Sequence, residues 1–159
     1  MKAKLYLETT IPSYLVGRPS RDLLVAARQE ITRDWWESRR SEFDLYVSEF
    51  VLQEVRAGDA LLASQRMEVL RGIPLLAVRS EIMELAEALM TMGPIPRKAA
   101  DDAAHIAIAT VYDCEYLLTW NCRHIANAEL HRSIRRVVEN YGYELPSLCT
   151  PEELMEGEI

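Results

Sequence analysis

The chain has 159 residues, of which 49% are apolar and 27% charged, as is typical of a globular protein. Its formal net charge of −7 argues against non-specific nucleic-acid binding, which uses a basic surface. No stretch approaches the roughly 18 uninterrupted apolar residues of a membrane span, and residues 1–4 lead into a predicted strand rather than a signal region. We therefore expect a cytoplasmic protein of one domain, residues 1–159, with residues 151–159 as a short acidic C-terminal segment.

The first predicted elements alternate between strand and helix. Residues 4–8 form a strand that ends on an acid, and a turn and a short helix follow it. Apolar residues at helical spacing predict a longer helix over residues 21–40. A second strand, residues 43–47, leads into a helix whose N-cap is Ser48.

The rest of the chain continues this alternation and contains an Ala-rich helix that is apolar on almost every face. Such a helix is normally buried, because small side chains let neighbouring elements pack close to its axis. The later predicted elements are a helix from Asp59 to about residue 71, a strand over 73–78, a helix over 80–91, the Ala-rich helix beginning near residue 99, a strand over 114–119, a helix over 122–140, an edge strand over 143–145 and a helix start at Thr150.

Strands that alternate with helices predict a three-layer α/β/α fold with a central, mainly parallel sheet of the Rossmann-like kind. In such sheets, ligand sites gather at the carboxyl ends of the strands. Glu8, Ser48 and the segment Thr119–Asn121 each follow or end a predicted strand. We therefore expect these polar residues to lie at one edge of the sheet.

Two adjacent acids open the Ala-rich helix, and helical geometry separates them by about 100°. Asp101 shares its face with His105 and Tyr112, a semi-polar face suited to solvent or a partner. Asp102 lies on the apolar side, where a carboxylate is costly unless a cation or a hydrogen-bond donor pairs with it. Asp102 is therefore the better candidate for a metal ligand, and stabilisation by the helix dipole is the alternative.

Simpler interpretations exist for the other polar residues. Glu8 suits a solvated strand end, and Glu54 suits the exposed face of its helix. The three histidines are predicted to be structural, and the three cysteines, which form no C-x-x-C pair, to be buried free thiols. A zinc site from Cys122, His124 and His131 is the less favoured alternative, because the rest of a ligand set is missing.

Four short motifs that each contain one candidate acid or amide follow one another in an informative order. They are Leu7–Thr10, Ser48–Glu54, Asp102–Ala109 and Leu118–Asn121. In this order the chain resembles the PIN domain, a family of metal-dependent nucleases that includes VapC-type toxins of bacterial toxin–antitoxin pairs. The resemblance covers essentially the whole chain, with Glu8 and Asn121 at positions where the family usually has Asp.

The resemblance implies a PIN-like fold in which four residues bind one or two Mg²⁺ or Mn²⁺ ions. These candidate catalytic and metal-binding residues are Glu8, Glu54, Asp102 and Asn121. Since the Asn121 amide lacks the charge of a carboxylate, we expect weak metal binding. The candidate supporting residues are Thr10 and Thr119, which would hold waters or a phosphate oxygen, and Asp101. Arginines within residues 33–40 or 132–136 would contact phosphates.

The resemblance also implies partners. It predicts a ribonuclease that acts on RNA as the toxin of a type II pair, with a small antitoxin protein as its partner and a homodimer as an open option. The alternative is a catalytically weak or silent PIN-like module that binds RNA or a protein. A generic α/β small-molecule binder is less favoured, because the chain has no Gly-rich phosphate loop.

Overall fold

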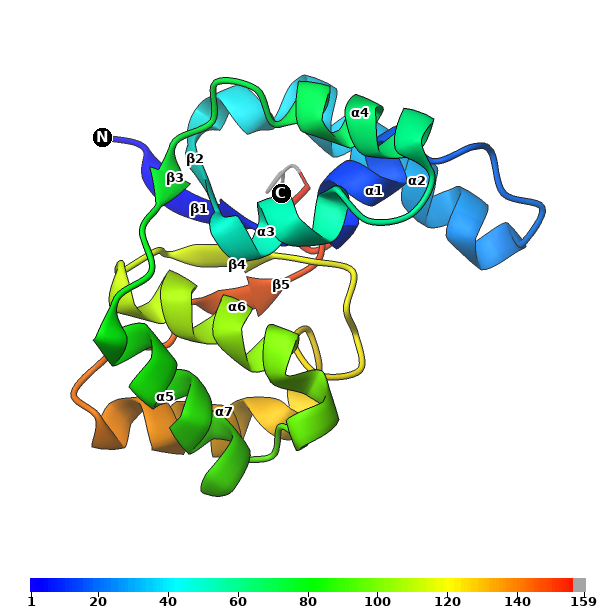
Figure 1. Cartoon of the computed structure of the whole chain (residues 1–159). Coiled ribbons are helices and arrows are strands. Elements are labelled where there is room, and N and C mark those ends of the chain that lie inside the picture. Colours follow the sequence, from blue (N-terminus) through cyan, green and yellow to red (C-terminus); the bar gives the residue numbers. More distant parts are fainter. Residues whose placement is uncertain (156–159) are drawn as a thin grey trace.

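The structure, a computed structural model, describes residues 1–155 (Figure 1). Residues 156–159, the end of the acidic segment expected from the sequence, lie outside the described residues. Five strands form one sheet in the order β3-β2-β1-β4-β5. They are β1 (Ala3–Leu7), β2 (Phe43–Ser48), β3 (Leu75–Leu76), β4 (Tyr116–Leu118) and β5 (Ser147–Cys149). All neighbouring pairs are parallel, which confirms the predicted parallel sheet.

Helices cover both faces of this sheet, as strands that are buried on both sides require. The helices of the described residues are α1 (Thr10–Val16), α2 (Leu23–Ser38), α3 (Glu49–Val55), α4 (Ala60–Val69), α5 (Ser80–Thr91), α6 (Ala100–Val111) and α7 (Ala128–Asn140), with short 3-10 turns η1 (Arg40–Glu42) and η2 (Arg97–Ala99). Figure 1 shows α5, α6 and α7 together on one side of the sheet and α1, α2 and α4 on the other. The predicted three-layer α/β/α fold is therefore confirmed.

The core is built around the central strand β1 and the Ala-rich helix α6. Leu5, Tyr6 and Leu7 of β1 have no exposed surface. Every residue of α6 from Ala103 to Thr110 is buried, as its uniformly apolar sequence predicts. Its alanines let α5 lie closely against it, and these two helices share an extensive contact. The buried part of α6 thus begins at Ala103, directly after the two acids that open the helix.

Two local predictions are wrong, and a third is confirmed in position but not in its hydrogen bond. The edge strand is not residues 143–145 but β5, since the Tyr143 amide donates to Val138 O at the end of α7. The helix predicted from residue 122 begins only at Ala128, where the Asn127 side chain caps it. Ser48 does occupy the N-cap position of α3, but its hydroxyl forms no capping hydrogen bond.

The segment after β5 begins as the sequence indicates. The Thr150 amide donates to the Glu153 carboxylate, and the Glu153 amide donates to the Thr150 hydroxyl, the reciprocal pair of a helix start. Within residues 151–155 this start continues only as turns. None of the helices within residues 1–155 is long and apolar enough to cross a membrane.

Candidate metal centre

Glu8 lies at the carboxyl end of β1, where the next residues turn into α1. Its side chain is only 4% exposed, so the solvated strand end considered from the sequence is wrong. One oxygen, Oε1, accepts hydrogen bonds from the Thr10 amide at 3.0 Å, the Thr10 hydroxyl at 2.5 Å and the Thr119 hydroxyl at 2.7 Å. Thr10 and Thr119 therefore hold Glu8, where the sequence predicted that they hold waters or phosphate.

Glu54 reaches the same place from the last turn of α3. Its Oε1 accepts a hydrogen bond from the Thr9 hydroxyl and lies 2.7 Å from His105 Nε2. Partial burial by itself raises the pKa of Glu54, but the hydrogen bond and charge of His105, with the Thr9 hydroxyl, outweigh it and leave the pKa below its ordinary value. Glu54 is therefore held as a carboxylate, with 31% of its side chain exposed.

His105 is fully buried, so the expectation that its side of the helix suits solvent is wrong for this residue. Its Nδ1 lies 2.7 Å from the Tyr6 hydroxyl, which lies 2.7 Å from the Ser48 hydroxyl. Burial lowers the pKa of His105, but the Glu54 hydrogen bond and the nearby carboxylates together raise it above its ordinary value. The sequence signal for His105 is that it is the one ionisable side chain in the otherwise apolar run from Ala103 to Ala109.

The two acids of α6 differ in solvent exposure, as the helical geometry predicts. Asp101 is exposed, whereas Asp102 is partly buried with 19% of its side chain accessible. Asp102 Oδ2 lies 2.9 Å from Nδ1 of His124, in the turn after β4. His124, which the sequence predicted as a structural residue or, less favoured, a zinc ligand, thus pairs with a candidate metal ligand.

The Asn121 side chain forms hydrogen bonds with backbone amides in the turn after β4. Its Oδ1 accepts hydrogen bonds from the amides of Arg123 at 3.2 Å and His124 at 3.0 Å. This turn brings His124 toward Asp102. With two donors on its amide oxygen, Asn121 orients the turn, and its role as a metal ligand stays a prediction.

A shared pattern unites the three carboxylates of this edge. In each, one oxygen accepts the hydrogen bonds described above, and the other makes none within the described residues. Among the buried side-chain polar atoms of residues 1–155 only Arg39 Nε lacks a hydrogen-bond partner, so the second oxygens of these carboxylates reach solvent. The carboxylates are those of Glu8, Glu54 and Asp102. Oxygen-rich groups held in this way fit a hard divalent cation such as Mg²⁺ or Mn²⁺.

The geometry brings part of the predicted ligand set close together. One ligand atom each from Glu8, Glu54 and His105 lies within 4.8 Å of the others. Asp102 is not part of this group, but it lies close enough for its charge to help raise the pKa of His105. The sequence therefore found two members of the group and missed the histidine.

The similarity of this chain to known proteins lies in its fold. No protein-family model and no curated protein matches the chain. The structure of VapBC2 from Rickettsia felis bound to a DNA fragment from their promoter matches with a TM-score of 0.55 and 15% identity, over 82% of this chain and 92% of that chain. VapC20 from Mycobacterium tuberculosis, a sarcin-ricin loop cleaving toxin, matches with a TM-score of 0.59 and 15% identity, over 75% and 91%. The fold is PIN-like.

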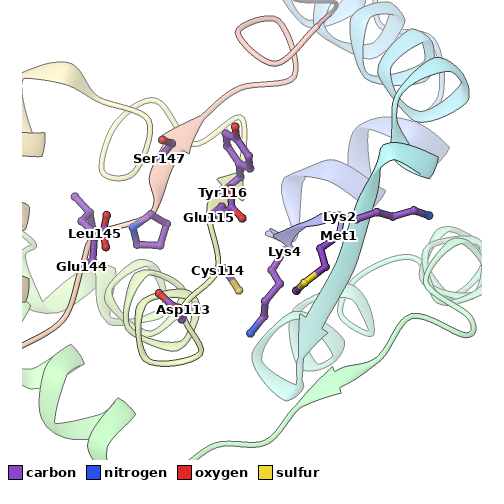
Figure 2. Close-up of a pocket in the computed structure, with 11 residues that line it drawn as sticks. Met1, Lys2, Lys4, Asp113, Cys114, Glu115, Tyr116, Glu144, Leu145 and Ser147 are labelled. Carbon is purple, nitrogen blue, oxygen red and sulfur yellow. The ribbon is translucent and has the colours of Figure 1, made fainter.

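A separate cavity of about 530 Å³ lies at the opposite edge of this PIN-like sheet, beside the amino ends of β1, β4 and β5 (Figure 2). Figure 2 shows Lys4 near Asp113 and Cys114 there. The Lys4 ammonium donates to Tyr112 O at 2.6 Å, so this cation is already engaged. Within the described residues the cavity brings no three metal-ligating groups together, unlike the edge that holds Glu8.

The cysteines of the PIN-like fold form no metal site within residues 1–155. Cys122, His124 and His131 do not gather, so the zinc alternative is not supported. Cys114 and Cys149 are buried free thiols as predicted, whereas Cys122 is exposed, which corrects the prediction for that residue.

The thiols should therefore differ in reactivity. Burial raises the pKa of Cys114 to about 11 and that of Cys149 to about 12, so both stay protonated near neutral pH. With iodoacetamide at pH 8 we expect modification of Cys122 alone in the folded protein and of all three thiols in denaturant, as measured by peptide mass spectrometry. Rapid modification of Cys114 or Cys149 before unfolding would contradict the packing of β4 and β5.

Proposed function

We propose that the chain is a single PIN-like domain that hydrolyses RNA phosphodiester bonds with the help of a divalent cation, as the cytoplasmic toxin of a type II toxin–antitoxin pair. One observation carries the proposal. The carboxylates of Glu8 and Glu54 meet at the carboxyl edge of the sheet and Asp102 borders them, each with one oxygen held by protein donors and one oxygen open to solvent. The PIN-like fold, shared with a toxin that cleaves the sarcin-ricin loop, supports RNA as the substrate.

In this proposal Glu8, Glu54 and Asp102 would hold Mg²⁺ or Mn²⁺. Such an ion lowers the pKa of a bound water and stabilises the oxygen that leaves in phosphodiester hydrolysis. The chain's own residues fix the ligands before the ion binds. The hydrogen-bond donors that do so are Thr10 and Thr119 at Glu8, Thr9 and His105 at Glu54, and His124 at Asp102.

Phosphate contacts would come from α7 rather than from α2. The arginines within residues 33–40 are already engaged, in the pairs Arg33–Glu30 at 3.1 Å and Arg39–Glu42 at 3.6 Å and with Arg40 over the Trp36 ring at 4.9 Å. Arg132, Arg135 and Arg136 are exposed and form no ion pair within the described residues. Free guanidinium groups are the ones that can pair with phosphate oxygens.

The proposal is tested by calorimetric Mn²⁺ titration and by RNA cleavage with Asp102→Asn. We expect Mn²⁺ affinity to fall at least about tenfold and metal-dependent cleavage to be lost, because the variant removes a ligand charge. Asp101→Asn makes the same change in charge one residue earlier, at an exposed position, and should have a smaller effect. Equal Mn²⁺ affinity of wild type and Asp102→Asn would contradict the assignment of Asp102 as a metal ligand.

A second candidate function is a catalytically silent PIN-like module that binds RNA or a protein. The observation in its favour is that Asn121 stands where a fourth acid is expected and its amide oxygen is used by the backbone. RNA binding without Mn²⁺-dependent cleavage would favour this alternative. A neighbouring gene for a small DNA-binding protein would favour the toxin, and co-purification of the two products would identify the antitoxin partner.

A further inference from the structure

We propose that His105, Tyr6 and Ser48 form a positioning network that orients Glu54 toward the metal, and that His105 is not itself a ligand. The inference rests on the proposed function, because it assumes that Glu54 binds the cation. It assigns a role to three residues at which the resemblance to PIN domains pointed to no function. The three belong to α6, β1 and β2, and they meet under the carboxyl edge of the sheet.

The hydrogens of this network can be assigned from the contacts. Ser48, Tyr6 and His105 follow one another at 2.7 Å spacings, and His105 Nε2 then lies 2.7 Å from Glu54 Oε1. A carboxylate oxygen only accepts, so Nε2 must carry the hydrogen that it donates to Glu54. Neutral His105 then accepts the Tyr6 hydroxyl hydrogen at Nδ1, and protonated His105 donates there instead. His105 therefore donates to Glu54 in both protonation states.

Burial makes this arrangement rigid. Tyr6, Ser48 and His105 each have no exposed surface. A buried polar group without a hydrogen-bond partner is costly, so each member of the network is confined to the rotamer that satisfies its neighbours. The network ends at Glu54, which is the one member whose side chain reaches solvent. Its direction toward the sheet edge is thus set from the core.

Glu54 depends on such a positioning network more than Glu8 does. It lies in the last turn of the seven-residue helix α3, whereas Glu8 follows the buried end of strand β1 and accepts three hydrogen bonds. The Glu54 side chain has several rotamers open to solvent, and ordering it costs conformational entropy. The His105 and Thr9 donors select one of them before a cation arrives, which strengthens binding without adding a ligand.

The competing role, direct coordination by His105, would break this network. Both ring nitrogens already have partners, and coordination through Nε2 would remove the hydrogen bond to Glu54. A buried histidine that donates to a ligating carboxylate instead acts as an outer-shell residue, which orients the ligand. We therefore assign His105 to positioning, although its Nε2 lies within the 4.8 Å group.

Four variants test the assignment. Tyr6→Phe removes the hydroxyl that fixes the His105 ring and keeps the aromatic volume. His105→Asn places an amide near Nδ1 and loses the donor to Glu54, whereas His105→Gln places an amide N–H near Nε2 and keeps it. Thr110→Val is the matched control, because it removes a buried hydroxyl from the same helix that bonds only to Ile106 O.

Mn²⁺ affinity by calorimetry is the first measurement, and circular dichroism of each metal-free variant checks the fold. We expect about tenfold weaker binding for Tyr6→Phe, about ten- to a hundredfold for His105→Asn, and rescue to within about threefold of wild type for His105→Gln. Thr110→Val should bind as wild type. Tyr6→Phe keeps the test valid if His105→Asn does not fold.

Pulsed electron paramagnetic resonance of Mn²⁺ bound to the wild type is the second measurement. We expect no coordinated imidazole nitrogen, and a strong nitrogen coupling that His105→Gln removes would overturn the positioning role. Wild-type affinity in Tyr6→Phe and His105→Asn, alongside loss in Glu54→Gln, would overturn the positioning role and leave the proposed function standing. Absence of Mn²⁺ binding by the wild type, or unchanged binding in Glu54→Gln, would overturn the metal site itself.

Discussion

Glu8→Gln is expected to reduce Mn²⁺-dependent RNA cleavage by about a hundred- to a thousandfold, the range found when one preorganised electrostatic group is removed from an active site. The variant keeps the length of the side chain and its acceptor oxygen, so Thr10 and Thr119 can still hold it. What it loses is the charge that the second oxygen would present to the cation. Cleavage at several Mn²⁺ concentrations, with a calorimetric titration, measures the effect.

The matched comparison for Glu8→Gln is Thr119→Val. This variant removes one of the three hydrogen bonds to Glu8 and keeps its charge, so we expect an intermediate loss of metal affinity. Both variants should remain folded, since β1 is buried by its apolar residues rather than by Glu8. Undiminished cleavage in Glu8→Gln would place the chemistry elsewhere and rule out the carboxyl edge of the sheet.

Trp35→Ala is expected to destabilise the protein by about 3–5 kcal/mol, the cost of truncating a fully buried tryptophan. Trp35 has no exposed surface, stacks on Phe43 with ring centroids 5.8 Å apart, and donates from Nε1 to Leu154 O at 3.2 Å. The variant would leave both a cavity between α2 and the sheet and an unpaired carbonyl. Because folded domains are stable by only about 5–15 kcal/mol, we expect a large shift of the urea unfolding midpoint.

Trp36→Ala provides the control on the same helix. Trp36 is partly buried and lies beneath the Arg40 guanidinium at 4.9 Å. Its ring packs against the core from a partly exposed position, so its replacement should cost less, about 1 kcal/mol. Equal unfolding midpoints for the two variants would show that Trp35 is not the anchor between α2, the sheet and the C-terminal turn.

Much of the fold follows from the sequence because the relevant signals are local. The 3.6-residue period over residues 80–91 predicts α5 with its observed bounds, and Asp59 caps α4 through the Leu62 amide as expected. The separation of Asp101 from Asp102 needs only the angle between adjacent helical residues. Each of these features depends on residues within one or two turns of one another.

The connections of polar side chains depend instead on residues that only the tertiary structure brings together. His105 forms a hydrogen bond with Tyr6, which is 99 residues away in the sequence, and Tyr6 forms one with Ser48, which is 42 residues away. Ser48 does occupy the N-cap of α3, but its hydroxyl contacts Tyr6 instead of capping the helix, and His105 is buried instead of facing solvent, because a distant partner is available in the core. A hydroxyl or an imidazole bonds to whichever group the packed sheet places within reach.

The sequence by itself thus determines the order of strands and helices, the parallel three-layer architecture and the acids at the carboxyl edge, since periodicity and strand ends are properties of short segments. Only the tertiary structure decides which oxygen of each acid is held, that His105 lies beneath the edge beside Glu8 and Glu54, and that the Asn121 amide oxygen bonds to the backbone. These outcomes depend on burial, because a buried donor or acceptor must find a partner wherever in the chain that partner lies.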